Sequence, residues 1–541
     1  MKRTTNMKRV TKFPSVPVLV LSVLLVALSG LAGCGSKDTP VSAGEEAAKT
    51  LRVGVITVSD EPFDPALVNL DYVEQIQPLY DSLLNVDENG NYTPGLAEEW
   101  SLSEDRLTYT LKLREGVKFH DGSVLTSEDV KFTLEYYISD TSRQADAVLL
   151  KRFIASIDTP DAQTAVIHFT APCTEFNYLL SEGSTGSGII IPKAYFEKVG
   201  AEAFAQDPVG TGPFKLESFA AGDKIVYAAN EDYWQGAPAY DKLILRQITD
   251  ESTRIAELQA GNIDFAPIGA ANASIFENSE DIVIETVDYS SSLAVFISGG
   301  YQDTGKATQN AGIRLALSAA IDRDALVDGI FEGQAKAAGA YGVFPFTPGY
   351  ETERSVPAHD PEKAKALLAE ANYPDAFEDP VVTLYDAPGR VYSTEVAQAI
   401  AGDWESVGIQ VEIVSIDPIT LGTEYTTNPA NESFAGAAYL FDPPRKYSLH
   451  DAFGPFFPSN SYFGLIQGDD VLDKDVEALL SQNDAERATT VVEILDRIDA
   501  SGVSIPLVYP STNYAVSSKV KSWDSTVAAH YGNWFYHFEL N

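Results

Sequence analysis

Residues 80–135, YDSLLNVDENGNYTPGLAEEWSLSEDRLTYTLKLREGVKFHDGSVLTSEDVKFTLE, carry the most informative pattern of the chain. Within this stretch, residues 107–113 alternate between apolar and polar side chains, which predicts a strand with one buried face. Thr126, with Asp129 three positions later, has the spacing of a capping box, so we expect a helix to begin there. The apolar side chains that follow share one face of this helix: Val130, Leu134, Tyr137 and Ile138.

The first 33 residues have the layout of a secretory signal peptide. Five basic and no acidic residues precede an apolar run over residues 16–28. The alternative is a transmembrane anchor, because residues 16–33 approach the roughly 18 residues that cross a bilayer. However, the Leu-Ala-Gly-Cys sequence that ends at Cys34 resembles a bacterial lipobox, in which the cysteine carries diacylglycerol and the chain is cut just before it. We therefore expect residues 1–33 to be a lipoprotein signal peptide, Cys34 to be the lipid anchor, and residues 34–49 to be a flexible tether.

Composition excludes several kinds of partner. The chain carries 78 acidic and 38 basic residues, a net charge of −40, and loss of the basic leader makes the charge more negative still. Such a surface repels nucleic acid and anionic lipid.

Beyond Cys34 the only cysteine is Cys173, so the body has no internal disulfide and depends on its hydrophobic core for stability. That body is long enough for two or three domains.

The second half of the chain contains a βαβ pattern. It consists of a strand, a helix and a strand at residues 381–385, 393–406 and 409–416. Such a unit favours a parallel pair with a right-handed crossover. Strand-rich sequence dominates residues 51–286 and βα sequence dominates 290–500, after which the chain is strand-like again. We therefore expect two crossings between the halves, near residues 287–298 and 501–512.

Further blocks follow residues 80–135 in a fixed order. They are VGTGPFKLESF (209–219), NEDYWQGAPAYDKLILRQITDESTRIAELQAGNIDF (230–265), IRLALSAAIDRDALV (313–327), HDPEKAKALLAEANYP (359–374), WESVGIQVEI (404–413) and VSIPLVY (503–509). In this order the blocks resemble the extracytoplasmic solute-binding proteins of ABC importers, in the family that takes peptides and nickel, solute-binding protein family 5. The resemblance spans nearly the whole chain after the leader.

This resemblance implies an α/β, two-lobed fold of the periplasmic-binding-protein type II-like kind. It has mixed sheets, a hinge of two crossovers and an extra subdomain in the first lobe. We expect lobe I over residues 50–288, with the inserted subdomain at about 80–200. Lobe II is expected over residues 289–502, and residues 503–541 return to lobe I.

The resemblance also implies that the solute is enclosed between the lobes, so loops that face such a cleft are candidates for binding. Arg390 lies between the predicted strand and helix, where free N–H groups and the helix dipole favour an anion. Its guanidinium suits a carboxylate. In dipeptide-binding members a similar loop holds the peptide carboxylate, and Arg390 with Tyr392 resembles it. A solvent-exposed arginine without a ligand is the alternative.

A second candidate segment is FAGAAYLFDPPRKYS, whose Asp442-Pro443 matches an acidic-proline pair of the family. Peptide-binding members often carry an Asp four residues before that proline to hold the peptide's amino group, where this chain has Tyr439. Asp442, Asp386 or Asp60 would then supply the negative charge. The predicted ligand-binding residues are Ser59, Asp60, Arg390, Tyr392, Tyr439, Phe441, Asp442 and Tyr509. Core packing explains Tyr509 equally well.

The sequence contains no hydrolase elbow, zincin, Walker or Rossmann motif, and its six histidines are scattered. We therefore expect no enzyme, no catalytic residue, no cofactor and no metal site. The resemblance implies a monomeric, lipid-anchored receptor on the extracytoplasmic side of the cell membrane, in the periplasm or on the outer face. It would deliver a small solute, in the first instance a peptide, to a permease and its ATPase subunits. The alternatives are a receptor for a nickel chelate or another carboxylate-bearing solute, a peptide sensor without import, and an envelope hydrolase.

Overall fold

The computed structural model describes most of the chain beyond the leader. The described residues are 48–68, 73–87, 89–298, 305–350, 353–387, 392–417, 420, 434–443, 447–461, 463–524 and 534–541. The predicted signal peptide, Cys34 and Arg390 lie outside them. Within the described part of the chain, no helix combines the length and the apolar composition that crossing a bilayer requires.

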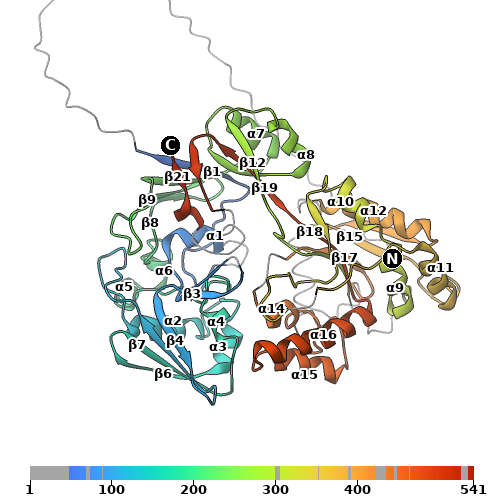
Figure 1. The fold of residues 1–541 in the computed structure, drawn as a ribbon, viewed down its shortest axis with the longest axis horizontal. Coiled ribbons are helices and arrows are strands. Elements are labelled where there is room, and N and C mark those ends of the chain that lie inside the picture. Colours follow the sequence, from blue (N-terminus) through green and yellow to red (C-terminus); the bar gives the residue numbers. More distant parts are fainter. Residues whose placement is uncertain are drawn as a thin grey trace, which may run out of the picture. The chain divides into compact units, whose positions relative to one another are not determined.

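A seven-stranded mixed sheet organises the first half of the chain (Figure 1). Its strands, in spatial order, are β12 (Ile282–Val287), β19 (Thr512–Ser517), β11 (Phe265–Ile268), β1 (Thr50–Val55), β10 (Lys242–Gln247), β9 (Lys224–Ala229) and β8 (Phe214–Ala220). β1 runs parallel to β10 and β11, and the other ladders are antiparallel. The helices of this half near the sheet are α1 (Val73–Ile76), α7 (Glu251–Gln259) and α8 (Ala270–Ala273).

The stretch over residues 80–135 begins a separate antiparallel layer and supplies its first two strands. A hairpin of β2 (Leu84–Val86) and β3 (Tyr92–Pro94) leads into the sheet β4 (Ala97–Leu102), β5 (Thr108–Leu113), β7 (Thr164–Phe169) and β6 (Ile154–Asp161). The predicted capping box is confirmed: the Thr126 N–H donates to the Asp129 carboxylate at 2.9 Å and begins α2 (Ser127–Tyr137). Val130, Leu134 and Tyr137 on its predicted face are fully buried. The other helices here are α3 (Ala147–Phe153), α4 (Phe176–Leu179), α5 (Lys193–Val199) and α6 (Ala201–Phe204).

A six-stranded mixed sheet organises the second half. Its order is β14 (Ala335–Ala337), β18 (Ser504–Pro510), β13 (Leu293–Ile297), β17 (Ala438–Phe441), β15 (Val382–Asp386) and β16 (Val411–Ser415). β15 and β16 are parallel and joined by α12 (Ser393–Ser406), which confirms the predicted βαβ unit. The other helices are α9 (Ala311–Ala320), α10 (Arg323–Gly329), α11 (Pro361–Glu370), α14 (Leu449–Phe453), α15 (Asp470–Ala478) and α16 (Asp484–Ser501).

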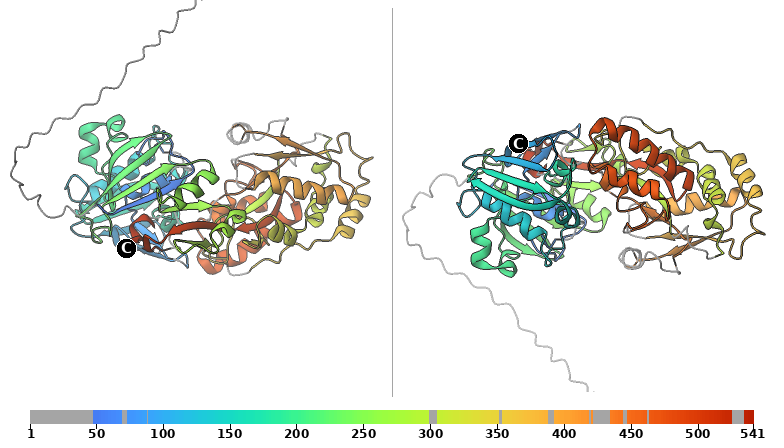
Figure 2. Two further views of the ribbon diagram at one scale, coloured as in Figure 1. Left: turned by 90° about the horizontal axis from the view of Figure 1, so that it is seen from above. Right: turned by 90° about the horizontal axis from the view of Figure 1, so that it is seen from below.

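The chain passes between the two large sheets twice. The first passage, residues 288–292, joins β12 to β13, and the second, Ser511, joins β18 to β19. In the left view of Figure 2, the red strand of the second passage runs from one half of the chain to the other. The chain returns to the first half later than the expected residue 503, because β18 pairs with β13 and β14 of the six-stranded sheet. The two crossovers agree with the expected hinge, and the remaining lobe boundaries stay predictions.

Candidate functional site

The predicted residues after β1 lie at the protein surface. Asp60 is exposed and Ser59 is half-buried. The Ser59 N–H donates to the side-chain oxygen of Gln75 at 3.3 Å, and the Ser59 hydroxyl oxygen accepts from the Glu61 N–H at 3.1 Å. These contacts order the segment and leave the Asp60 side chain facing solvent.

Tyr392 lies at the start of α12 and connects the two halves of the chain. Its backbone has a left-handed φ of 59°, and its ring packs against Phe331 at 4.7 Å between centroids. Its hydroxyl oxygen accepts the backbone N–H of Ala270, at the start of α8, at 2.7 Å. Burial raises the pKa of Tyr392, so the hydroxyl keeps its proton and that proton remains able to donate.

Tyr439, Phe441 and Asp442 lie at the end of β17. Tyr439 is buried, whereas Phe441 and Asp442 are half-buried. Phe441 stacks on Phe296 at 5.2 Å and contacts Phe456 edge-on at 5.5 Å. This end of the six-stranded sheet is therefore an aromatic wall followed by a carboxylate.

Two further candidates have complete internal partners. Tyr509 lies on β18, and its hydroxyl donates to the carbonyl oxygens of Ala340 at 2.7 Å and Val343 at 3.1 Å. Asp386 is buried, and its carboxylate accepts the hydroxyls of Ser393 at 2.9 Å and Thr394 at 3.0 Å. Packing accounts for both side chains, and a role in binding stays a prediction.

A buried ion pair joins the two halves at a second place. Arg487 of α16 and Glu175, just before α4, are 7% and 5% exposed, and their charged atoms are 2.6 Å apart. The Arg487 guanidinium also donates to the Thr174 hydroxyl at 2.6 Å and to the Leu479 carbonyl oxygen at 3.1 Å. Nearby, the Tyr178 hydroxyl donates to Asp451 at 3.0 Å. These contacts hold the helices of the second half against the antiparallel layer of the first.

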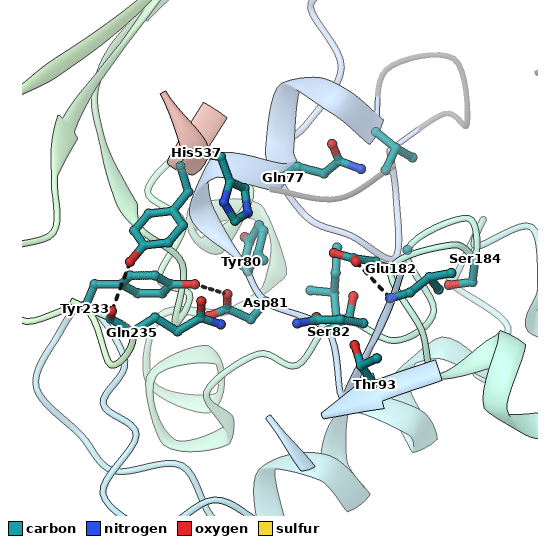
Figure 3. Close-up of a pocket in the computed structure, with 16 residues that line it drawn as sticks. Gln77, Tyr80, Asp81, Ser82, Thr93, Glu182, Ser184, Tyr233, Gln235 and His537 are labelled. Carbon is teal, nitrogen blue, oxygen red and sulfur yellow. Dashed lines mark hydrogen bonds between the residues drawn. The ribbon is translucent and has the colours of Figure 1, made fainter. Parts of the chain in front are cut away.

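A polar cavity of about 220 Å³ lies in the first half (Figure 3). Its lining comprises Val73, Gln77, Tyr80, Asp81, Ser82, Asn85, Val86, Thr93, Glu182, Ser184, Gly186, Ile189, Tyr233, Gln235, Tyr536 and His537. The Asp81 carboxylate accepts the hydroxyls of Thr211 at 2.8 Å and Tyr233 at 2.7 Å, and the indole N–H of Trp234 at 3.0 Å. Burial raises the pKa of Glu182 to about 7.

Sequence reasoning did not identify this cavity. Gln77, Glu182 and His537 are far apart in the chain and belong to no motif. Tyr80 and Asp81 stand in the stretch over residues 80–135, but there they indicate a scaffold. Two larger cavities, of about 580 and 560 Å³, occur elsewhere. Of the predicted ligand-binding residues that the structure describes, none lines any of these three cavities.

The described residues contain no group of three histidine, cysteine or carboxylate side chains arranged to hold a metal ion. His450 is the histidine closest in sequence to the Asp442 segment, and burial lowers its pKa to about 4.

Two mixed sheets joined by two crossovers, with an added antiparallel layer on the first, define the two-lobed fold of an extracytoplasmic solute-binding protein. Residues 91–451 match the family model of bacterial extracellular solute-binding proteins, family 5 Middle. This chain is 30% identical over 492 residues to the glutathione-binding protein GsiB of Escherichia coli O1:K1, a match that covers 89% of this chain and 93% of that relative. The chain therefore belongs to the family 5 bacterial extracellular solute-binding proteins.

Solved structures show the same fold. NikA from Brucella suis, in complex with Fe(III)-EDTA, has a TM-score of 0.80 at 22% identity, covering 91% of this chain and 100% of that one. DppA from Helicobacter pylori, in complex with the peptide STSA, has a TM-score of 0.75 at 23% identity, covering 91% and 98%. The predicted fold class is thus confirmed. The protein is the solute-binding component of an ABC importer and acts outside the cytoplasm with permease and ATPase subunits.

Proposed function

We propose that this chain is a monomeric, lipid-anchored receptor that captures a peptide-type solute with a free carboxylate between its lobes, without chemical conversion. The observation that carries the proposal is the 30% identity to a glutathione-binding protein over 89% of the chain. Glutathione is a tripeptide with two carboxylates and one amino group. Arg390, which precedes α12 in the sequence, is the proposed carboxylate-binding residue, because a guanidinium binds a carboxylate through two parallel hydrogen bonds.

Capture requires only a biased equilibrium. A solute that touches both lobes in the closed form shifts the population toward that form. To change the ratio of closed to open forms from 1:99 to 99:1, the solute must bind the closed form more tightly than the open form by about 5.5 kcal/mol. The Tyr392 hydroxyl and the aromatic wall at Phe441 are the proposed contacts of the second lobe, and Ser59 and Asp60 are those of the first.

The lipid on Cys34 is the proposed membrane attachment. Among the described residues no helix is suited to crossing a bilayer, and the sequence that ends at Cys34 resembles a lipobox followed by a polar segment. Membrane retention would then depend on this single side chain.

Isothermal titration calorimetry of the purified protein tests the proposal. Glutathione and the peptide Ser-Thr-Ser-Ala should bind to the wild-type protein, and Arg390→Ala should weaken binding at least about tenfold. Arg143→Ala, which removes an exposed arginine of the first half, serves as the control and should leave the affinity unchanged. Failure of every peptide, together with binding of a nickel-histidine complex, would instead support a metal-chelate receptor.

A further inference from the structure

The polar cavity contains an amide that lacks partners. Gln77, at the start of the short helix η2 (Gln77–Leu79), is only 5% exposed and lines the cavity. Neither its side-chain nitrogen nor its side-chain oxygen has a hydrogen-bond partner among the described residues. A buried polar group left unpaired costs about 1–3 kcal/mol, so native proteins normally satisfy such groups. The Gln77 amide therefore indicates that the cavity holds a polar group.

The charge of the cavity favours a cation. Asp81 and Glu182 are among its lining residues, and no lysine or arginine is among those that the structure describes. Asp81 already accepts three side-chain donors, whereas the described residues give Glu182 one donor, the Val86 N–H at 3.0 Å. The Ser184 hydroxyl donates to the Ser181 carbonyl oxygen, so its own oxygen can still accept. The Glu182 carboxylate, the Gln77 amide oxygen and the Ser184 hydroxyl thus offer open acceptors, which suit an ammonium group with three donors.

The cavity lies beside the contact between the two halves. Its wall includes Val86, and a methyl group on the neighbouring Gly183 would lie 3.3 Å from Val86 and 3.4 Å from the ring of Tyr447 in the second half. The cavity is smaller than the roughly 300–1,000 Å³ of sites that enclose a whole small ligand. It therefore suits one end of a solute whose remainder lies between the lobes.

We propose that this cavity binds the primary ammonium group of the solute, with the Glu182 carboxylate and the Gln77 amide oxygen as its acceptors. The inference rests on the proposed function, a peptide-type solute. In peptide-binding members, an Asp four residues before the proline that matches Pro443 often holds the amino group of the peptide. This chain has Tyr439 at that position, and we assign the role to the Glu182 cavity instead. Figure 3 shows Gln77 and Glu182 on different elements around the same cavity.

Binding of an ammonium group should be linked to the proton on Glu182. Its pKa is raised to about 7, first by burial and then by the charge of Asp81, so binding must release this proton near neutral pH. The other titratable groups that face the cavity are Asp81, His537, Tyr80, Tyr233 and Tyr536. Burial lowers the pKa of His537 and raises those of the three tyrosines, so these four groups stay neutral between pH 7 and 8.

The test is calorimetry with glutathione and N-acetylglutathione at pH 8. Acetylation should weaken binding to the wild-type protein at least about tenfold. Glu182→Gln and Gln77→Leu should each weaken glutathione binding about tenfold and shrink the effect of acetylation, whereas Glu99→Gln, at an exposed position on β4, should do neither. Lowering the pH from 8 to 6 should weaken wild-type binding by about a further factor of ten, and Glu182→Gln should abolish that dependence.

The outcomes separate the two proposals. If glutathione binds but acetylation and Glu182→Gln change nothing, the ammonium site is overturned and the receptor function stands. If neither glutathione nor Ser-Thr-Ser-Ala binds, the proposed function fails, and the cavity is then probed with ethylammonium by thermal shift. Stabilisation that is lost in Glu182→Gln would support the ammonium site, and no stabilisation of the wild-type protein would overturn it.

Discussion

Replacing Arg487 by methionine tests the buried contact between the two halves. The substitution leaves Glu175, which is 5% exposed, without its counter-charge, and also removes bonds to Thr174 and Leu479. Breaking one side of a buried ion pair costs about 3–5 kcal/mol. Burial already raises the pKa of Glu175, so protonation of this carboxyl limits the loss at low pH. We therefore expect Arg487→Met to lower the free energy of unfolding by about 3–5 kcal/mol at pH 8, and less at pH 5.

A double-mutant cycle with Glu175→Gln provides the assay. Urea unfolding of the wild-type protein, both single variants and the double variant should give a coupling energy above about 1.5 kcal/mol. Arg497→Met, on the exposed side of α16, is the matched control, because its pair with Asp469 is part-exposed and worth less than about 1 kcal/mol. A coupling energy below about 0.5 kcal/mol would show that the two side chains do not stabilise each other across the two halves.

Three further changes have definite expected outcomes. Cys34→Ala should move the full chain from the membrane to the soluble fraction after cell lysis, and continued sedimentation with membranes would argue against the lipid. Gly212→Ala should destabilise the fold by about 3 kcal/mol, because the added methyl would lie 2.4 Å from the backbone of Leu79. Gly402→Ala on α12 is the control: its added methyl meets open space and should not destabilise the fold, and thermal unfolding compares the two variants. Burial raises the pKa of Asp64 to about 6, so the folded protein holds this proton more tightly than the unfolded chain does. As the pH rises from 4 to 6, the wild-type protein should therefore lose about 2 kcal/mol of stability relative to Asp64→Asn, and parallel pH profiles would contradict this.

Local features of the fold could be predicted because short-range chemistry determines them. The Thr126 capping box and the βαβ unit at residues 382–415 both follow from patterns that are local in the sequence. Strand partners are different, because an alternating pattern does not say which strand lies alongside. For this reason β18 was expected in the first lobe and pairs instead with β13 and β14.

The candidate site was less accessible to sequence reasoning. Tyr392 was predicted because, with Arg390, it resembles the carboxylate-binding loop of dipeptide-binding members. The structure shows its hydroxyl oxygen bonded to the N–H of Ala270, a partner more than a hundred residues away. The unpaired amide of Gln77 and the raised pKa of Glu182 arise only when distant segments enclose a cavity. Neither residue stands in a motif, so no signal in the sequence could have singled them out.

If the two lobes close on a solute, the distance between them must shorten when the solute binds. Spin labels at Glu98→Cys on β4 and Glu412→Cys on β16, both exposed positions, report on the two halves in a Cys34→Ala background, where the remaining Cys173 is buried. Pulsed electron resonance should show a broad distance distribution without solute, and a single shorter distance once the solute that binds most tightly in calorimetry is added. A distribution that saturating solute leaves unchanged would contradict the account.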